Sequence, residues 1–223
     1  MTAAKLLDQA RALLLDFDGP VCSVFAGIPA AVVADQLRTV LADGGCTDLP
    51  EPVATSSDPF DVLTYATSLS DEDGRHVEAA FTAHEVEAIT TAAPTEGAHE
   101  LIQAWHESGR PIAIVSNNSA AAISSYLDFH ALRPLIDAVA ARETADARLL
   151  KPSPYLVAQA FGALDVAPER CVLVGDSVSD VEAARAAGVR SIGYANKLGK
   201  GEKLVSAGAD AITEVLADLA GVR

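Results

Sequence analysis

Short apolar runs alternate with alanine-rich segments of helical periodicity along most of the chain. The apolar runs are typical of buried strands, the last one named being the weakest: Ala12–Phe17, Ile112–Val115, Cys171–Val174, Ser191–Gly193 and Asp137–Ala140. Helices are predicted between them, each ending at a glycine, a proline or a polar turn: Glu96–Ser108, Ser119–Leu127, Pro154–Leu164 and Val178–Ala187. This alternation favours an α/β fold with a Rossmann-like parallel sheet covered by helices on both faces.

One long interval interrupts the alternation. Between the first strand and Glu96, the segment from Cys22 to Pro94 contains no convincing strand. Three amphipathic stretches in it predict helices, with proline-rich turns around Pro50 to Pro59: Pro29–Ala42, Pro59–Ser68 and Glu72–Thr90. We therefore expect a core of residues 1–20 and 95–223 and an inserted α-helical cap domain of residues 21–94.

Charge and cysteine content narrow the classes of partner. The 223 residues include 31 acidic and 16 basic side chains, a net charge of −15 that opposes binding to nucleic acid. The apolar runs are too short to span a membrane, and Asp16 interrupts the N-terminal one before it could serve as a signal peptide. Three cysteines without paired spacing indicate free thiols in a reducing compartment. We expect a cytoplasmic protein that binds neither nucleic acid nor membrane.

Polar residues gather where the predicted strands end, which is where open parallel sheets place their ligands. Asp16 and Asp18 close the first strand, Ser116 and Asn117 follow the second, and Asp176 and Asp180 follow the Cys171–Val174 strand. Carboxylates about 4 Å apart repel by roughly 4 kcal/mol per pair at an effective dielectric near 20. A divalent cation would relieve this repulsion. Carboxylates without a His or Cys cluster favour Mg²⁺ over zinc, with Asp16 and Asp176 as ligands.

The remaining groups at these strand ends suit a phosphate. Lys151 offers a fixed cation and Ser116 a hydroxyl donor, both suited to a tetrahedral oxyanion. A metal-held Asp16 carboxylate can attack phosphorus and form an aspartyl phosphate. Asp18 can then hold a proton for the leaving oxygen and take one from the attacking water. Gly19 permits a tight exit from the strand and close approach of the backbone to phosphate.

Four short segments carry a family resemblance. Taken in chain order, they resemble the four motifs of the haloacid dehalogenase superfamily: Asp16-Phe17-Asp18-Gly19, Ser116-Asn117, Lys151-Pro152 and Gly175-Asp176-Ser177-Val178-Ser179-Asp180. The match covers nearly the whole core, and the inserted helices correspond to that family's cap of the first type. Each motif alone is a weak signal, whereas four in order are a strong one.

The resemblance implies a role for each matched residue. It makes Asp16 the nucleophile, Asp18 the general acid and base, and Ser116, Asn117 and Lys151 the group that binds the phosphoryl. Asp176 and the backbone carbonyl of Asp18 would bind Mg²⁺ with Asp16. Asp180 would support the metal shell or orient Lys151.

Two details of the first motif refine the expectation. The presence of Asp18 argues against the dehalogenase branch, which typically lacks this second aspartate. Pro20 stands where the family commonly has threonine, which removes a hydroxyl and a backbone N–H from the loop that leads to the cap.

Several of these residues also have ordinary structural explanations. Asp180 could serve only the N-terminus of its helix, for which Ser177 and Ser179 are good caps. Ser116 could likewise be a simple helix cap, and Lys151 a solvated loop residue. We interpret Lys197, Lys200 and Lys203 as a solvated face, the alternative being that they rim the pocket.

The sequence therefore predicts a Mg²⁺-dependent phosphatase that hydrolyses a small phosphorylated metabolite through an aspartyl phosphate. One alternative is a phosphomutase of the same superfamily, which must hold a bisphosphate. The predicted cap has twelve acidic residues against Arg38 and Arg75, which favours a neutral or cationic leaving group instead. A second alternative is a non-catalytic phosphate-binding protein, for which Pro20 is the sole support.

Overall fold

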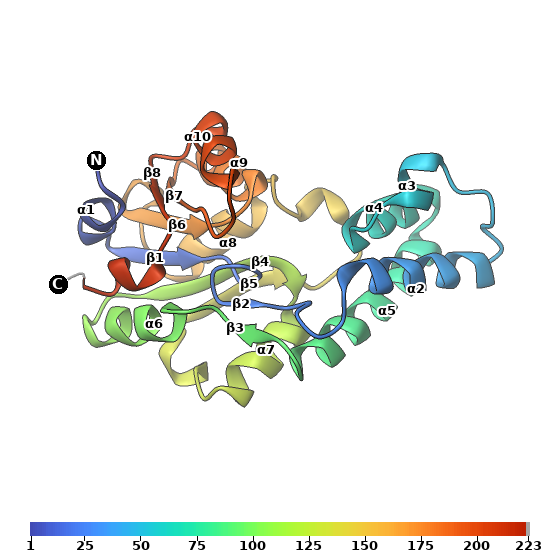
Figure 1. Cartoon of the computed structure of the whole chain (residues 1–223), viewed down its shortest axis with the longest axis horizontal. Coiled ribbons are helices and arrows are strands. Elements are labelled where there is room, and N and C mark those ends of the chain that lie inside the picture. The colour runs from blue at the N-terminus through green and yellow to red at the C-terminus, as the bar shows by residue number, and fades with distance from the viewer. Residues whose placement is uncertain (222–223) are drawn as a thin grey trace.

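The computed structural model describes residues 1–221 and is built on a six-stranded, fully parallel sheet of strand order β5-β4-β1-β6-β7-β8 (Figure 1). Its strands are β1 (Ala12–Leu15), β4 (Ile112–Ser119), β5 (Ala138–Arg142), β6 (Cys171–Gly175), β7 (Arg190–Tyr194) and β8 (Ala211–Thr213). The predicted α/β fold with a Rossmann-like parallel sheet is confirmed. All five predicted strands form, whereas β8, at the edge, was not predicted.

Alternate residues of the central strands feed two apolar clusters on opposite faces of the sheet. Leu13 and Leu15 of β1 join the cluster on one face, and Leu14 joins the cluster on the other. Both faces are dry because helices cover each of them, so these strands are apolar at nearly every position. Because all six strands run in the same direction, their carboxyl ends lie along one edge of the sheet.

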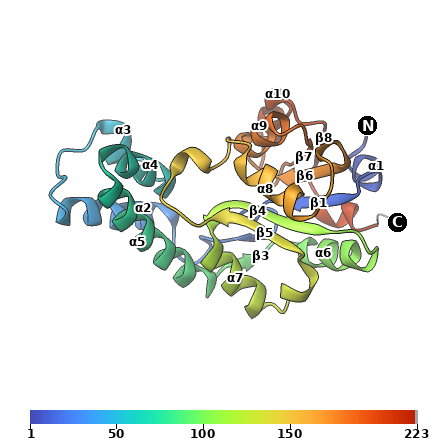
Figure 2. The same ribbon diagram turned by 180° about the vertical axis from the view of Figure 1, so that it is seen from behind.

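Helices cover the two faces unequally, as the front and rear views show (Figures 1 and 2). One face carries α1 (Ala3–Asp8), α6 (Ala98–Glu107), α7 (Ala120–Phe129) and the 3₁₀ turns η1 (Arg133–Leu135) and η4 (Leu216–Leu219). The other carries α8 (Tyr155–Ala163), α9 (Val178–Ala186) and α10 (Lys200–Ala207). Two further 3₁₀ turns, η2 (Ala147–Leu149) and η3 (Pro168–Arg170), lie in loops. Among residues 1–221, no helix has both the length and the apolar character that crossing a bilayer requires.

The interval after the first motif forms a group of helices beyond the carboxyl edge of the sheet (Figure 1). They are α2 (Ala30–Asp43), α3 (Glu51–Thr55), α4 (Pro59–Leu69) and α5 (Asp71–Ile89). Helices were predicted at three of these positions. The fourth, α3, forms where the sequence indicated only proline-rich turns, because Pro52 stands in the first turn of a helix, where its missing N–H costs nothing.

Two crossings join these helices to the sheet. The strands β2 (Cys22–Ser23) and β3 (Ala93–Pro94) pair antiparallel there, so the interval is not free of strand as expected. Two-residue strands are too short to leave a periodic signal in the sequence. The division into a core of residues 1–20 and 95–223 and a cap of residues 21–94 remains our prediction.

Candidate active site

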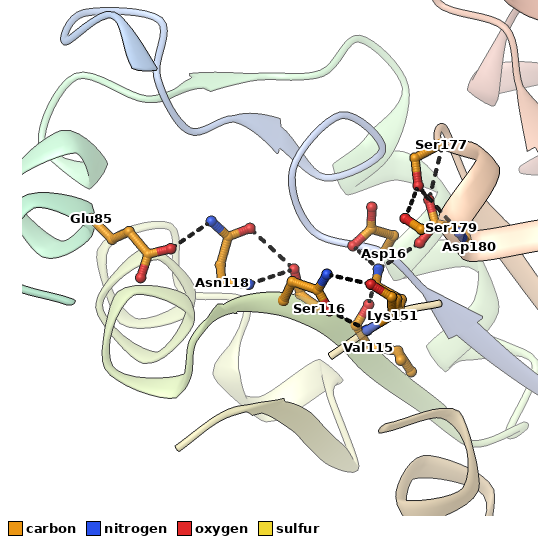
Figure 3. Close-up of polar contacts among 10 residues, drawn as sticks. Asp16, Glu85, Val115, Ser116, Asn118, Lys151, Ser177, Ser179 and Asp180 are labelled. Carbon is orange, nitrogen blue, oxygen red and sulfur yellow. Dashed lines mark hydrogen bonds and ion pairs between the residues drawn. The ribbon is translucent and has the colours of Figure 1, made fainter. Parts of the chain in front are cut away.

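Lys151 lies at the centre of the polar cluster at the carboxyl edge of the sheet (Figure 3). Its side chain is buried, and Nζ donates to Asp16 Oδ1 at 2.7 Å, to Asp180 Oδ1 at 2.5 Å and to the carbonyl of Val115 at 3.0 Å. Burial alone would lower the pKa of Lys151, but the two carboxylates outweigh it and raise the pKa above its ordinary value. The two carboxylates therefore favour the charged form of the lysine, which joins the first motif to the fourth.

Asp180 has two structural duties at once. Its Oδ2 accepts hydrogen bonds from the backbone N–H of Ser177 at 2.9 Å and from the Ser177 hydroxyl at 2.6 Å, which completes a capping box at the start of α9. Its Oδ1 meanwhile holds Lys151. Asp180 thus caps its helix and also contacts Lys151, so both of its carboxylate oxygens are occupied. Its role in a metal shell stays a prediction.

Gly175 makes this arrangement possible. A Cβ at this position would lie 2.4 Å from the Cβ of Asp180, closer than side-chain packing allows. The last residue of β6 therefore has to be glycine if Asp180 is to lie across the strand end and reach Lys151.

Asp16 is a buried carboxylate among other acids. Burial and the neighbouring Asp180 raise its pKa to about 8, while Lys151 acts in the opposite direction and Asp176 adds to the increase. Within residues 1–221, its side chain accepts one hydrogen bond, from Lys151 Nζ to Oδ1. Burial and crowding by the other acids therefore disfavour the ionised form of Asp16, and a bound cation would relieve the repulsion between the acids.

The first motif ends in a tight turn that fixes Asp18 and Gly19. Asp18 Oδ1 accepts from the N–H of Val24 at 2.9 Å, on the chain that enters the helical interval. Burial raises the pKa of Asp18, and this hydrogen bond partly opposes the increase. The turn closes through hydrogen bonds from Val21 and Cys22 to the carbonyl of Phe17. None of them needs an N–H at Pro20, so the unusual proline leaves the turn intact.

Gly19 lies directly against Asp176. Its φ of +108° is in the left-handed region, and a Cβ there would lie 2.4 Å from Cγ of Asp176. The Gly19 carbonyl accepts from Thr95 Oγ1 at 2.5 Å, which joins the first motif to the returning chain. The backbone of the first motif and the carboxylate of the fourth thus come into direct contact.

Asp176 is held by two residues that sequence reasoning did not assign to the site. Asn196 Nδ2 donates to Asp176 Oδ2 at 3.0 Å, and Lys200 Nζ forms an ion pair with the same oxygen. The interpretation of Lys200 as part of a solvated face is therefore wrong. This contact is not evident from the sequence, in which Lys197, Lys200 and Lys203 form one basic run. Lys200 differs from the other two because it is the first residue of α10 and pairs with Asp176.

Ser116 and Asn117 lie on β4, which extends through Ser119 instead of ending at Val115 as predicted. Asn117 is bound to the backbone of Lys151 on both sides: Nδ2 donates to the carbonyl at 3.1 Å, and Oδ1 accepts from the N–H at 2.7 Å. Its side chain thus places Lys151. The Ser116 hydroxyl is buried and bonded to Asn118, and Ser119, not Ser116, caps α7.

The acids at this edge fit a hard cation. Asp16, Asp176 and Asp180 each offer a carboxylate oxygen, and the three atoms lie within 4.8 Å of one another. The donors are all oxygen, the set that Mg²⁺ and Ca²⁺ prefer. Because both oxygens of Asp180 already accept hydrogen bonds, Asp16 and Asp176 are the better-placed ligands.

A cavity lies outside this cluster. It has a volume of about 740 Å³ and is lined by α4, the start of α5 and the segment Ala145–Arg148. None of the four motifs contributes to its lining. Arg75 and Arg148 are its basic residues, and Arg148 pairs with Asp146.

Comparison with known proteins places the chain in a family. The model of the haloacid dehalogenase-like hydrolases matches residues 10–188, which contain all four motifs. The chain belongs to this hydrolase family. The resemblance drawn from the motifs is thereby confirmed.

Individual relatives of this hydrolase are distant. Pyrophosphatase PpaX of Halalkalibacterium halodurans is 31% identical over 46% of the chain and 47% of that relative. A phosphoglycolate phosphatase of Vibrio vulnificus is 24% identical over 96% of each chain. The crystal structure of a CbbY mutant from Rhodobacter sphaeroides with xylulose-1,5-bisphosphate has a TM-score of 0.71 at 22% identity, covering 96% of this chain and 99% of that one. At that identity the structural likeness shows the shared fold.

Proposed function

We propose that this hydrolase is a Mg²⁺-dependent phosphatase that acts on a small phosphorylated metabolite. The observation that carries the proposal is the contact of Lys151 with both Asp16 and Asp180 at the carboxyl edge of the sheet. It gathers a reactive carboxylate, a buried cation and a set of hard oxygen ligands in one place. Such a combination suits phosphoryl transfer, in which positioning and charge stabilisation do most of the work.

Asp16 is the proposed nucleophile. Its free oxygen attacks phosphorus and forms an aspartyl phosphate, while the bond from phosphorus to the leaving oxygen breaks. Asp18 donates a proton to that oxygen, a role that its raised pKa supports. Asp18 then takes a proton from water, whose oxygen bonds to phosphorus as the acyl phosphate breaks. Mg²⁺, held by Asp16, Asp176 and the carbonyl of Asp18, would neutralise charge on the phosphoryl oxygens.

Ser116 and Lys151 are the proposed ligands of the transferring phosphoryl group. Lys151 supplies a positive charge, because its two carboxylate partners favour the protonated form of its amine. Asn117 acts through Lys151, because its side chain binds the lysine backbone on both sides. Lys200 is the proposed counter-charge for Asp176.

Residues 21–94 are the proposed cap over this site. Arg38 is already engaged inside that segment, with Asp35 and with the carbonyls of Val53 and Ser56. Only Arg75 then remains in the segment for an anionic leaving group, and it lines the separate cavity. This scarcity of positive charge supports a phosphatase over a phosphomutase, which must also bind the second phosphate of a bisphosphate.

Hydrolysis of p-nitrophenyl phosphate, with and without Mg²⁺, tests the proposal. We expect Mg²⁺-dependent release of phosphate that Asp16→Asn lowers by at least about 1000-fold. Turnover by Asp16→Asn at the native rate would refute the nucleophile. Tight phosphate binding without turnover on a broad metabolite panel would instead favour the non-catalytic alternative. Phosphoglycolate and pyrophosphate, named in the relatives, are the first metabolites to include.

A further inference from the structure

A second buried charge cluster joins helix α5 to the end of β4. Glu85 of α5 is completely buried, and each of its oxygens is occupied. Oε1 accepts from Asn118 Nδ2 at 2.9 Å, and Oε2 accepts from the N–H of Ser119 at 3.0 Å and from Arg142 Nη2 at 2.5 Å. None of these residues has a role in the mechanism proposed above. Burying a carboxylate costs free energy, which its hydrogen-bond partners only partly offset. The complete burial of Glu85 therefore suggests a role for it beyond packing.

Arg142 fixes the position of Glu85. Its fully buried guanidinium binds Glu85 through Nη2 and Glu78 through Nη1, both at 2.5 Å, and these acids stand two turns apart on α5. Its Nε donates to the carbonyl of Asn117 at 3.1 Å. The arginine therefore holds α5 against the strand that carries Ser116 and Asn117, and Glu85 has little freedom to move.

Asn118 transmits this position to Ser116 (Figure 3). A carboxylate can only accept, so Glu85 selects the amide orientation in which Nδ2 faces it. The opposite end of the amide, Oδ1, then faces Ser116 and accepts from its hydroxyl at 3.1 Å. The N–H of Asn118 also donates to Ser116 Oγ, at 3.3 Å. Both hydrogen bonds that the hydroxyl makes within residues 1–221 are therefore with Asn118.

We propose that Glu85 and Asn118 are positioning residues that hold the Ser116 hydroxyl ready for a phosphoryl oxygen. The inference rests on the proposed function, because it takes Ser116 as a phosphoryl ligand. With Oγ already fixed, the hydroxyl proton needs only to rotate from Asn118 Oδ1 to the incoming oxygen. A donor oriented in advance is worth more than one that must be ordered during binding.

The chain offers a control for this proposal. Glu78 lies on α5, as Glu85 does, and accepts a hydrogen bond from the other terminal nitrogen of Arg142, Nη1. It makes no hydrogen bond to Asn118. Glu78→Gln and Glu85→Gln thus each remove one carboxylate from the same arginine. Only Glu85→Gln alters the acceptor of Asn118, because glutamine has one oxygen where glutamate has two. Asn118→Leu removes the link itself and leaves Glu85 with Arg142 and Ser119.

The experiment measures two quantities in Mg²⁺ buffer: the Kd of inorganic phosphate by calorimetry and kcat/KM for p-nitrophenyl phosphate. Circular dichroism checks that each variant is folded. We expect Asn118→Leu and Glu85→Gln to weaken phosphate binding and lower kcat/KM by roughly tenfold, the value of one hydrogen bond to a charged ligand. Glu78→Gln should change either quantity less than about twofold. In a Ser116→Ala background, Asn118→Leu should add less than about twofold, because its target is gone.

Three results would overturn the proposal: native values for Asn118→Leu, an undiminished loss in the Ser116→Ala background, or equal losses for Glu78→Gln and Glu85→Gln. If Glu85→Gln does not fold, the cycle of Asn118→Leu with Ser116→Ala decides alone. If the unmutated protein binds phosphate but does not hydrolyse p-nitrophenyl phosphate, the proposed phosphatase activity is refuted. The Kd values of the variants would still test whether Glu85 and Asn118 position Ser116. A native protein that does not bind phosphate would refute both.

Discussion

Gly19 is the residue on which the contact between the first and fourth motifs depends. Its backbone lies so close to Asp176 that a single methyl group would occupy the space of the carboxylate. Its positive φ adds a second reason, since other residues are strained in that conformation. At this scale the sequence was informative, because Asp16, Asp176, Asp180 and Lys151 are all near one another, as the motif order indicated.

We expect Gly19→Ala to lower Mg²⁺-dependent activity by at least about 100-fold, because the displaced Asp176 cannot hold a cation near Asp16. Gly45→Ala is the matched control: its φ is +95°, yet nothing lies within 4 Å of the position of its Cβ. Initial rates with p-nitrophenyl phosphate over a Mg²⁺ series measure the effect. Equal losses in the two variants would attribute the effect to backbone strain and contradict the steric explanation.

Two elements show what the sequence could not reveal. The strand predicted at Ile112–Val115 continues to Ser119 because Asn118 and Ser119 are buried against Glu85, which lies more than thirty residues away in the chain. A period-two pattern records only apolar burial, so polar residues with buried polar partners look like a loop. Helix α10 escaped prediction for a related reason, since Gly199 and Gly201 frame its first residue and its lysines indicate a solvated loop.

Helix α10 carries a testable consequence through its first residue. Lys200 pairs with Asp176 and opposes a second cation there, so Lys200→Met should tighten Mg²⁺ binding by roughly threefold to tenfold, the partial exposure of the pair limiting the effect. Isothermal titration with MgCl₂ measures the affinity. Lys203→Met, an exposed position on the same helix, should leave it unchanged. Weaker Mg²⁺ binding by Lys200→Met would show that the lysine supports the cation instead.

Negative charge dominates the molecule as a whole. The net charge of −15 includes carboxylates that the fold forces together at one edge of the sheet. Their mutual repulsion opposes folding, and Lys151 and Lys200 offset only part of it. A cation that binds the folded chain and not the unfolded one should therefore raise the free energy of unfolding.

At a Mg²⁺ concentration 100 times its Kd, we expect a gain of about 2.7 kcal/mol in the free energy of unfolding. Thermal melts with MgCl₂ and with EDTA measure it. Asp176→Asn should abolish most of the gain, whereas Asp43→Asn, which removes the same charge from an exposed position of α2, should retain it. A gain that persists in Asp176→Asn would place the cation elsewhere.

The strand order also determines when the site comes into being. Neighbouring strands β1 and β6 bring Asp16 beside Asp176, although most of the polypeptide separates them. At a ribosomal rate of about 5–20 residues per second, a nascent chain spends many seconds with its first motif made and its fourth not yet synthesised. The proposed ligand set of the cation is complete only after Asp176 has been synthesised, so the apolar strands have to assemble before the proposed site exists.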